Sequence, residues 1–210
     1  VYIDAQNGQL LGSMEQIHDM KQCSHAIGTG VSNYAGTVEF TTKSMALGTI
    51  FQLNDETRGG GIETYNSNSL WIFQDIAYFN TNNHWIEDPT AIDVHWGAAQ
   101  AYDYFYHNHG RDSYDDAGGK IVNQVHYGQD YNNAFWNGSW MVYGDGDGVK
   151  FSSTTSLDIV GHEITHGITQ HTANLVYAYE SGALNESFSD IFATLIELEY
   201  HPNGGNWTIG

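Results

Sequence analysis

Two histidines four positions apart, with a glutamate after the first, occupy His162-Glu163-Ile164-Thr165-His166. On an α-helix four residues advance roughly 400° and rise about 6 Å, so both imidazoles leave one face and can bind a single metal ion. Glu163 points roughly 100° away from His162, where a carboxylate can deprotonate a water molecule activated by the metal. The motif predicts a helical zinc site for hydrolysis, although isolated copies also arise by chance.

The surrounding residues support a helix over 157–170, because this run contains no proline and its apolar residues recur at helical spacing. Asp158, His162 and His166 then form one polar stripe along it. The simpler interpretation of such a stripe is a solvated helix face.

A second helix is predicted over about 182–199, with a stripe of three acidic residues: Glu186, Asp190 and Glu197. Its apolar side is formed by residues at helical spacing: Leu184, Phe188, Ile191, Phe192 and Leu195. The short connection between the two helices favours antiparallel packing.

In the antiparallel register, Glu186 lies opposite His166, and Asp190 lies opposite His162. Glu186 becomes the third zinc ligand, which leaves a fourth coordination position open for water. Asp190 can accept the free N–H of His162 and fix its tautomer.

The same register brings Asp158 opposite Glu197. Two like charges are costly side by side unless a cation lies between them, and ligation by oxygen alone favours calcium. We therefore expect at least one structural calcium ion beside the catalytic zinc.

The residues Gly182-Ala-Leu-Asn-Glu-Ser-Phe-Ser-Asp190, placed after H-E-x-x-H, resemble the thermolysin family of secreted bacterial neutral metalloendopeptidases. The resemblance extends upstream to 131–148, 58–62 and 64–66, and covers roughly residues 27–210. It implies an α+β fold. Residues 27–155 would form a β-rich N-terminal domain with one long helix. Residues 156–210 would carry the zinc-binding helices and the start of a truncated C-terminal domain, whose helical lobe is mostly absent.

The N-terminal residues 1–11 are predicted to form a hairpin around an Asn-Gly turn. They resemble the last hairpin of the propeptide in this family, so residues 1–26 are interpreted as a propeptide tail of a zymogen. The mature chain would begin between Cys23 and Thr29. The alternative is an ordinary N-terminal hairpin.

The resemblance implies that the hydroxyl of Tyr177 stabilises the oxyanion of the transition state and that Asn185 orients the second histidine. On the residues alone, a tyrosine in a connecting loop is more often a packing residue.

The resemblance also implies a substrate-binding edge at Asn133, Ala134 and Trp136, where an extended peptide adds to a sheet. Phe151 and Ile159 would line an apolar pocket for the side chain after the cleaved bond, favouring Leu, Phe or Ile. Plain core packing is the alternative for both groups.

Further elements are predicted from strand periodicity, turn residues and caps. The expected strands are 36–42, 49–53, 69–79 and 120–127, with a hairpin of 133–136 and 139–143 around Asn137-Gly138 and a helix from Asp88-Pro89 to Gly110. Residues 144–148 are interpreted as a turn rather than a calcium loop.

The net charge is −19, from 25 acidic and 6 basic residues, which argues against nucleic acid or anionic membranes as partners. No apolar stretch is long enough to span a bilayer. The single Cys23 forbids an internal disulfide, and metal ions can stabilise a secreted chain instead. We expect a processed or excised piece of a secreted, extracellular monomer, with peptide substrates and its own propeptide as partners.

The leading hypothesis is a secreted zinc endopeptidase that cleaves on the N-terminal side of bulky apolar residues, with Glu163 as general base. The alternative is a catalytically incomplete, zinc- and calcium-stabilised fragment or binding module. A zinc hydrolase acting on something other than peptides is disfavoured by the expected substrate edge.

Overall fold

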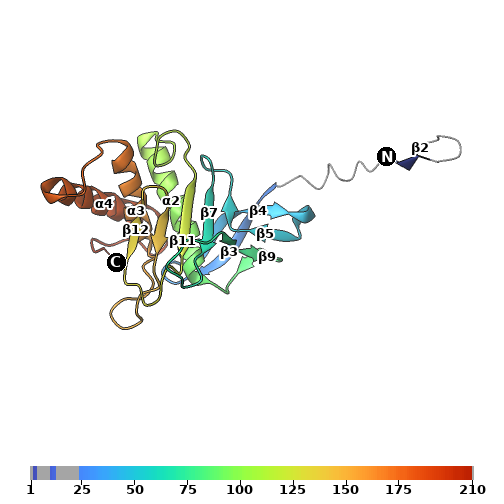
Figure 1. The fold of residues 1–210 in the computed structure, drawn as a ribbon, viewed down its shortest axis with the longest axis horizontal. Coiled ribbons are helices and arrows are strands. Elements are labelled where there is room, and N and C mark those ends of the chain that lie inside the picture. The colour runs from blue at the N-terminus through green and yellow to red at the C-terminus, as the bar shows by residue number, and fades with distance from the viewer. Residues whose placement is uncertain (1, 4–9, 13–23, 210) are drawn as a thin grey trace.

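The computed structural model describes residues 2–3, 10–12 and 24–209. The chain has an α+β fold, as predicted: a β-rich N-terminal region precedes the two helices that carry the predicted metal ligands (Figure 1). At the N-terminus, β1 (Tyr2–Ile3) pairs antiparallel with β2 (Leu10–Gly12), which confirms the predicted hairpin. Its Asn-Gly turn and Cys23 lie outside the described residues.

A five-stranded sheet has the order β10-β3-β4-β5-β9. Its main unit is an antiparallel hairpin that turns at Gly36, whose φ of 74° lies in the left-handed region. The strands are β3 (Ser24–Ser32), β4 (Gly36–Met45), β5 (Ile50–Gln52), β9 (Phe79–Asn80) and β10 (His84–Trp85), with the short 3-10 helix η1 (Ala46–Gly48) before β5.

A six-stranded sheet has the order β12-β13-β11-β7-β6, with β8 paired to β7. The parallel strands β7, β11 and β13 form its centre, and β12 pairs antiparallel with β13 across the predicted Asn137-Gly138 turn. Edge strand β12 faces α3 (Figure 1). The bounds are β6 (Asn54–Asp55), β7 (Ile62–Asn66), β8 (Ile76–Ala77), β11 (Ile121–Val125), β12 (Ala134–Trp136) and β13 (Met141–Tyr143).

The predicted strand over 69–79 is wrong over most of its length, because residues 69–75 form an irregular loop and only β8 and β9 follow. Its aromatic residues pack on other rings instead of alternating across a sheet. The Trp71 ring lies 5.6 Å from that of Tyr127, and the Phe73 ring stacks on Tyr127 at 5.5 Å. Ring packing of this kind buries aromatic side chains without a strand, although the same residue types favour strands.

Helix α2 (Pro89–His109) is bounded as predicted: the Asp88 side chain accepts from Ala91 N at 3.1 Å, and Gly110 ends the helix with a φ of 65°. Buried apolar residues of α2 pack against both sheets and against α3, so this helix is the centre of the core. His95 is a packing residue here, fully buried between Thr64 Oγ1 and the Thr41 carbonyl at 3.1 Å from each.

Helices α3 (Leu157–His171) and α4 (Tyr179–Tyr200) pack closely, and α4 begins three residues before its predicted start. Gly161 lies in the contact between the two helices: a Cβ there would lie 2.9 Å from Ile196 Cδ1 and 3.4 Å from Ala193 Cα. The contact face of α4 therefore consists of small and polar residues together with Ile196.

The predicted apolar side of α4 is buried only in part. Phe192 and Leu195 pack against the core, whereas Leu184, Phe188 and Ile191 are exposed. The polar stripe, rather than the apolar one, faces α3. Among the described residues, no helix is long and apolar enough to cross a membrane.

An ionic contact joins the start of α2 to the loop after β13. His126 Nε2 lies 2.8 Å from Asp88 Oδ2, and its Nδ1 lies 2.7 Å from Asp145 Oδ1. Burial lowers the pKa of His126, but the hydrogen bonds to Asp145 and Asp88 outweigh it and raise the pKa to about 10. This histidine is therefore a cation in the neutral range.

A His126→Gln variant should lose stability in a pH-dependent way. The folded-state pKa is raised from 6.5 to about 10, so the contribution is fully present below pH 6.5 and is lost as the pH rises through 10. We expect the variant to be destabilised by roughly 1.5–3 kcal/mol at pH 6 and by much less above pH 10, measured by urea unfolding. A His107→Asn control should show no such trend, and an equal deficit at both pH values would contradict this assignment.

Candidate metal centre and substrate groove

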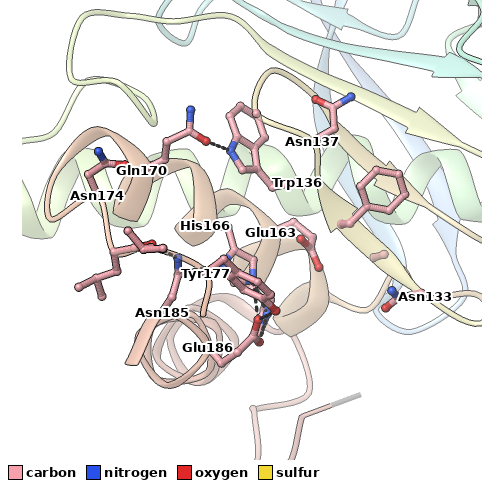
Figure 2. Close-up of a pocket in the computed structure, with 16 residues that line it drawn as sticks. Asn133, Trp136, Asn137, Glu163, His166, Gln170, Asn174, Tyr177, Asn185 and Glu186 are labelled. Atoms are coloured by element: carbon pink, nitrogen blue, oxygen red, sulfur yellow. Dashed lines mark hydrogen bonds and ion pairs between the residues drawn. The ribbon is translucent and has the colours of Figure 1, made fainter. Parts of the chain in front are cut away.

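The two histidines of the motif, on α3, and one glutamate, on α4, converge on one point, and Figure 2 labels His166 and Glu186 of this group. The Nε2 atoms of His162 and His166 lie 2.9 Å apart. The Glu186 carboxylate lies 3.2 Å from Nε2 of His162 and 3.5 Å from Nε2 of His166. The ligand atoms of all three lie within 4.8 Å of one another, which is the grouping predicted from the sequence.

The second nitrogen of each ring is held by an oxygen from α4. His162 Nδ1 lies 2.9 Å from Asp190 Oδ1, and His166 Nδ1 lies 2.7 Å from Asn185 Oδ1. A carboxylate only accepts, and the Asn185 amide donates its own N–H to the Leu175 carbonyl at 3.3 Å. Both imidazoles therefore carry their proton on Nδ1.

With the protons on Nδ1, the Nε2 lone pairs of both rings point into the same space beside a carboxylate. This arrangement is unfavourable without a cation, and it fits the two nitrogens and one oxygen of a catalytic zinc site with an open fourth position. Burial lowers the pKa of His166, and the hydrogen bond from its Nδ1 to Asn185 opposes that shift.

Glu163 lies beside this centre with only 5% of its surface exposed. Its Oε2 atom is buried and has no hydrogen-bond partner in the described part of the chain. Burial raises the pKa of Glu163 to about 8; the backbone N–H of Trp136 opposes the shift, and the charge of Glu186 adds to it. A cation in the site would act in the opposite direction. The orphaned oxygen suits a group that binds a transient partner.

Tyr177 reaches the centre from the loop between α3 and α4 (Figure 2). Its hydroxyl donates to Glu186 Oε1, and its ring lies 6.0 Å from that of His166. The hydrogen bond to Glu186, together with burial, raises the pKa of Tyr177 to about 12, so the group is a proton donor at neutral pH. Although Tyr177 is 69% exposed, its hydroxyl faces the candidate metal centre.

Two adjoining cavities meet at the centre. The first, about 690 Å³, lies between β12 and the α3–α4 connection, and includes Asn133, Ala134 and Trp136 of the predicted substrate edge. The second, about 510 Å³, includes Phe151 and Ile159 of the predicted apolar pocket. Both share four lining residues: Asn133, Ala134, His162 and Glu163.

Gln170 also belongs to the groove and was not predicted. Its Oε1 accepts the Trp136 indole N–H at 2.7 Å, and this bond ties strand β12 to α3 (Figure 2). The only sequence signal is its position, one further step of four along the stripe of Asp158, His162 and His166. Ser189, which was also not singled out, has its hydroxyl 3.2 Å from His166 Nδ1.

The predicted acid pair is brought together away from the groove. Asp158 and Glu197 are both buried on the facing sides of α3 and α4. Burial raises the pKa of Glu197, the charge of Asp158 adds to the rise, and the Asn206 backbone N–H at 3.3 Å opposes it. Two buried carboxylates in this position are a candidate cation site.

Comparison with known proteins gives the same family along the whole groove. The model of the thermolysin metallopeptidase catalytic domain matches residues 27–170, and the model of the thermolysin alpha-helical domain matches residues 173–210.

Curated relatives include bacillolysin from Brevibacillus brevis, 44% identical over 100% of this chain and 37% of that protein. Thermolysin from Bacillus sp. strain EA1 is 41% identical over 99% of this chain and 40% of its own length. The chain thus spans about two fifths of these relatives. Among solved structures, the precursor of protealysin, a metalloproteinase from Serratia proteamaculans, matches with a TM-score of 0.64 and 34% identity, covering 71% of this chain and 48% of its own. The chain belongs to the thermolysin metallopeptidase family.

Proposed function

We propose that the chain is part of a secreted zinc endopeptidase. The main support is that two imidazole Nε2 atoms and the Glu186 carboxylate converge beside a buried glutamate, one oxygen of which has no hydrogen-bond partner among the described residues. The relatives named thermolysin, bacillolysin and neutral protease support peptide hydrolysis as the reaction.

His162, His166 and Glu186 would hold the zinc ion, which supplies a Lewis acid that polarises the substrate carbonyl. Glu163 takes a proton from water as the water oxygen bonds to the carbonyl carbon. It then donates that proton to the amine as the C–N bond breaks. The Tyr177 hydroxyl would donate a hydrogen bond to the oxyanion. Asp190 and Asn185 keep both imidazoles in the orientation that presents Nε2.

The substrate would bind in extended form along edge strand β12. Its backbone would hydrogen-bond near Asn133, Ala134 and Trp136, so many sequences fit. The second cavity, with Phe151 and Ile159, would receive the side chain after the cleaved bond. We therefore infer cleavage on the N-terminal side of Leu, Phe or Ile.

The proposal also includes a structural calcium ion, the domain bounds and the oligomeric state. A calcium ion between Asp158 and Glu197 would offset the repulsion of their charges. Residues 1–26 are proposed as a propeptide tail, 27–155 as the N-terminal domain and 156–210 as the zinc helices with the start of a C-terminal domain. The net charge of −19 favours mutual repulsion of copies, and hence a monomer, which we infer to be extracellular from the relatives of this family.

A zinc- and calcium-stabilised binding module is the second candidate. A purely structural zinc site is closed by four protein ligands and requires no base. The three-residue ligand set and the orphaned Glu163 oxygen both favour the enzyme.

Replacing Glu163 by Gln should abolish cleavage while keeping zinc bound, because the carboxylate moves a proton and is not a ligand. We expect the rate to fall by roughly 10²–10⁴-fold at unchanged zinc stoichiometry, measured on peptides with products mapped by mass spectrometry. Cuts should precede Leu or Phe. The matched control is Glu180→Gln, an exposed acid on α4, which should cleave normally. Full activity of the Glu163→Gln protein would reject the mechanism, and zinc binding without any cleavage by the unaltered chain would favour the binding module.

Calcium should stabilise the chain through Glu197. At a calcium concentration about 100 times the dissociation constant, binding adds about 2.7 kcal/mol to the free energy of unfolding. In zinc-saturated protein, Glu197→Gln should lose this calcium-dependent gain in thermal unfolding, whereas Glu199→Gln, exposed on the same helix, should retain it. Equal calcium protection in both variants would show that the ion binds elsewhere.

A further inference from the structure

One lysine lines the second cavity without a role in the proposed chemistry. Lys150 lies in the loop between β13 and α3 and borders the cavity beside Phe151. It forms no ion pair within the described residues. The other described lysine and arginine side chains are held by protein oxygens: Lys43 by Glu56, Arg58 by Asp55 and Asp103, Lys120 by Glu63, and Arg111 by the Tyr114 carbonyl.

The backbone around Lys150 is fixed by Asp147. One oxygen of this carboxylate accepts the N–H groups of Val149, Lys150 and Phe151 at 2.9, 2.7 and 3.2 Å. The other oxygen accepts the Asn132 amide at 2.7 Å. Asp147 therefore binds the backbone of Lys150 and forms no ion pair with its ammonium group, which leaves that charge available to a ligand.

The place of Lys150 in the cavity defines what it can meet. The cavity is lined by His162 and Glu163, by the apolar side chains of Phe151 and Ile159, and by Lys150. Among the described residues that line the two cavities, Lys150 is the one lysine or arginine. Successive side chains of an extended peptide point to opposite faces, so the residue after the one held at Phe151 would be met by the long, exposed side chain of Lys150 reaching from the rim of the cavity.

The strongly negative charge of the protein as a whole means that a carboxylate of the substrate would find few positive partners other than Lys150. A net charge of −19 repels acidic peptides in general, so an isolated lysine in the groove is a local exception. Carboxylates pair with ammonium groups through charge-assisted hydrogen bonds. Because Lys150 is exposed, the pair should change affinity by only about 2–5-fold, the range of solvent-exposed ion pairs, and salt should weaken it.

We propose that Lys150 is a specificity-determining residue that selects a carboxylate on the second residue after the cleaved bond. The inference rests on the proposed function for the direction of the substrate. The carboxylate can be a Glu or Asp side chain, or the C-terminal carboxylate of a peptide that ends at that residue. The two sources share one chemistry and differ in where the peptide ends.

The test uses four peptides with a common sequence and Leu after the cleavable bond. In three of them the next residue is Glu, Gln or Lys within a longer, amidated peptide; the fourth ends at that Gln with a free carboxylate. Cleavage is measured with the zinc- and calcium-loaded chain. Binding is measured by fluorescence anisotropy with the Glu163→Gln protein, so that the affinity comparison does not depend on turnover.

We expect the Glu peptide to be bound and cleaved about 2–5-fold better than the internal Gln peptide, with the Lys peptide weakest. Lys150→Gln should remove the preference, Lys150→Glu should invert it and Lys150→Arg should retain it. The control Lys120→Gln removes one positive charge outside both cavities and should leave the preference unchanged. A preference for the peptide with the free carboxylate, alone or in addition, would identify the chain terminus as a ligand.

The outcomes separate this inference from the proposed function. Equal cleavage of the Glu and Gln peptides, or a preference that persists in Lys150→Gln, would overturn the role of Lys150 and leave the peptidase intact. Lys150-dependent binding without cleavage would support the carboxylate site and contradict the peptidase activity of this chain. If the peptides are neither bound nor cleaved, both the role of Lys150 and the proposed function are rejected.

Discussion

The close contact between α3 and α4 is the constraint on which the site depends. Gly161 lets the helices approach where a larger residue would meet Ile196 and Ala193. At this separation Asp190 and Asn185 reach the Nδ1 atoms of the two histidines and turn both Nε2 lone pairs toward Glu186. The packing of two helices thus creates a cluster of electron-rich atoms that a divalent cation would stabilise. Metal binding and helix packing should be coupled, because each stabilises the same arrangement.

The sheet supplies the second half of the groove. Strand β12 is held by β13 on one side and is tied to α3 by the Trp136–Gln170 hydrogen bond. The loop after β13 is anchored by His126 and Asp147, which fixes the wall that carries Lys150 and Phe151. A groove with an open strand edge, an apolar cavity and one isolated cation would combine broad backbone recognition with selection at particular side chains.

The sequence predicts the grouping of His162, His166 and Glu186 because helical spacing and the antiparallel register are enough to bring these three side chains together. The spacings of 158, 162 and 166 and of 186, 190 and 197 fix both stripes, and the short connection fixes the antiparallel register. The residues of the groove wall came from family resemblance, since Phe151 and Ile159 have no periodic signal of their own.

Gln170 and Lys150 could not be assigned, because their contacts depend on how β12 and the loop after β13 lie against α3. The error at 69–79 has the same origin: aromatic residues favour strands locally, but here they pack on Tyr127. The exposed side of α4 shows that a periodic apolar stripe predicts a helix without stating which face is buried.

The most direct test of the account is the coordination of zinc by the chain itself. X-ray absorption spectroscopy of the protein loaded with one equivalent of zinc should show two imidazole nitrogens, with the remaining ligands oxygen, at about 2.0–2.2 Å. Glu186→Gln should weaken zinc binding without removing the imidazole signal. A spectrum without two imidazoles, or with a sulfur ligand from Cys23, would contradict the assignment of His162, His166 and Glu186 as the metal centre.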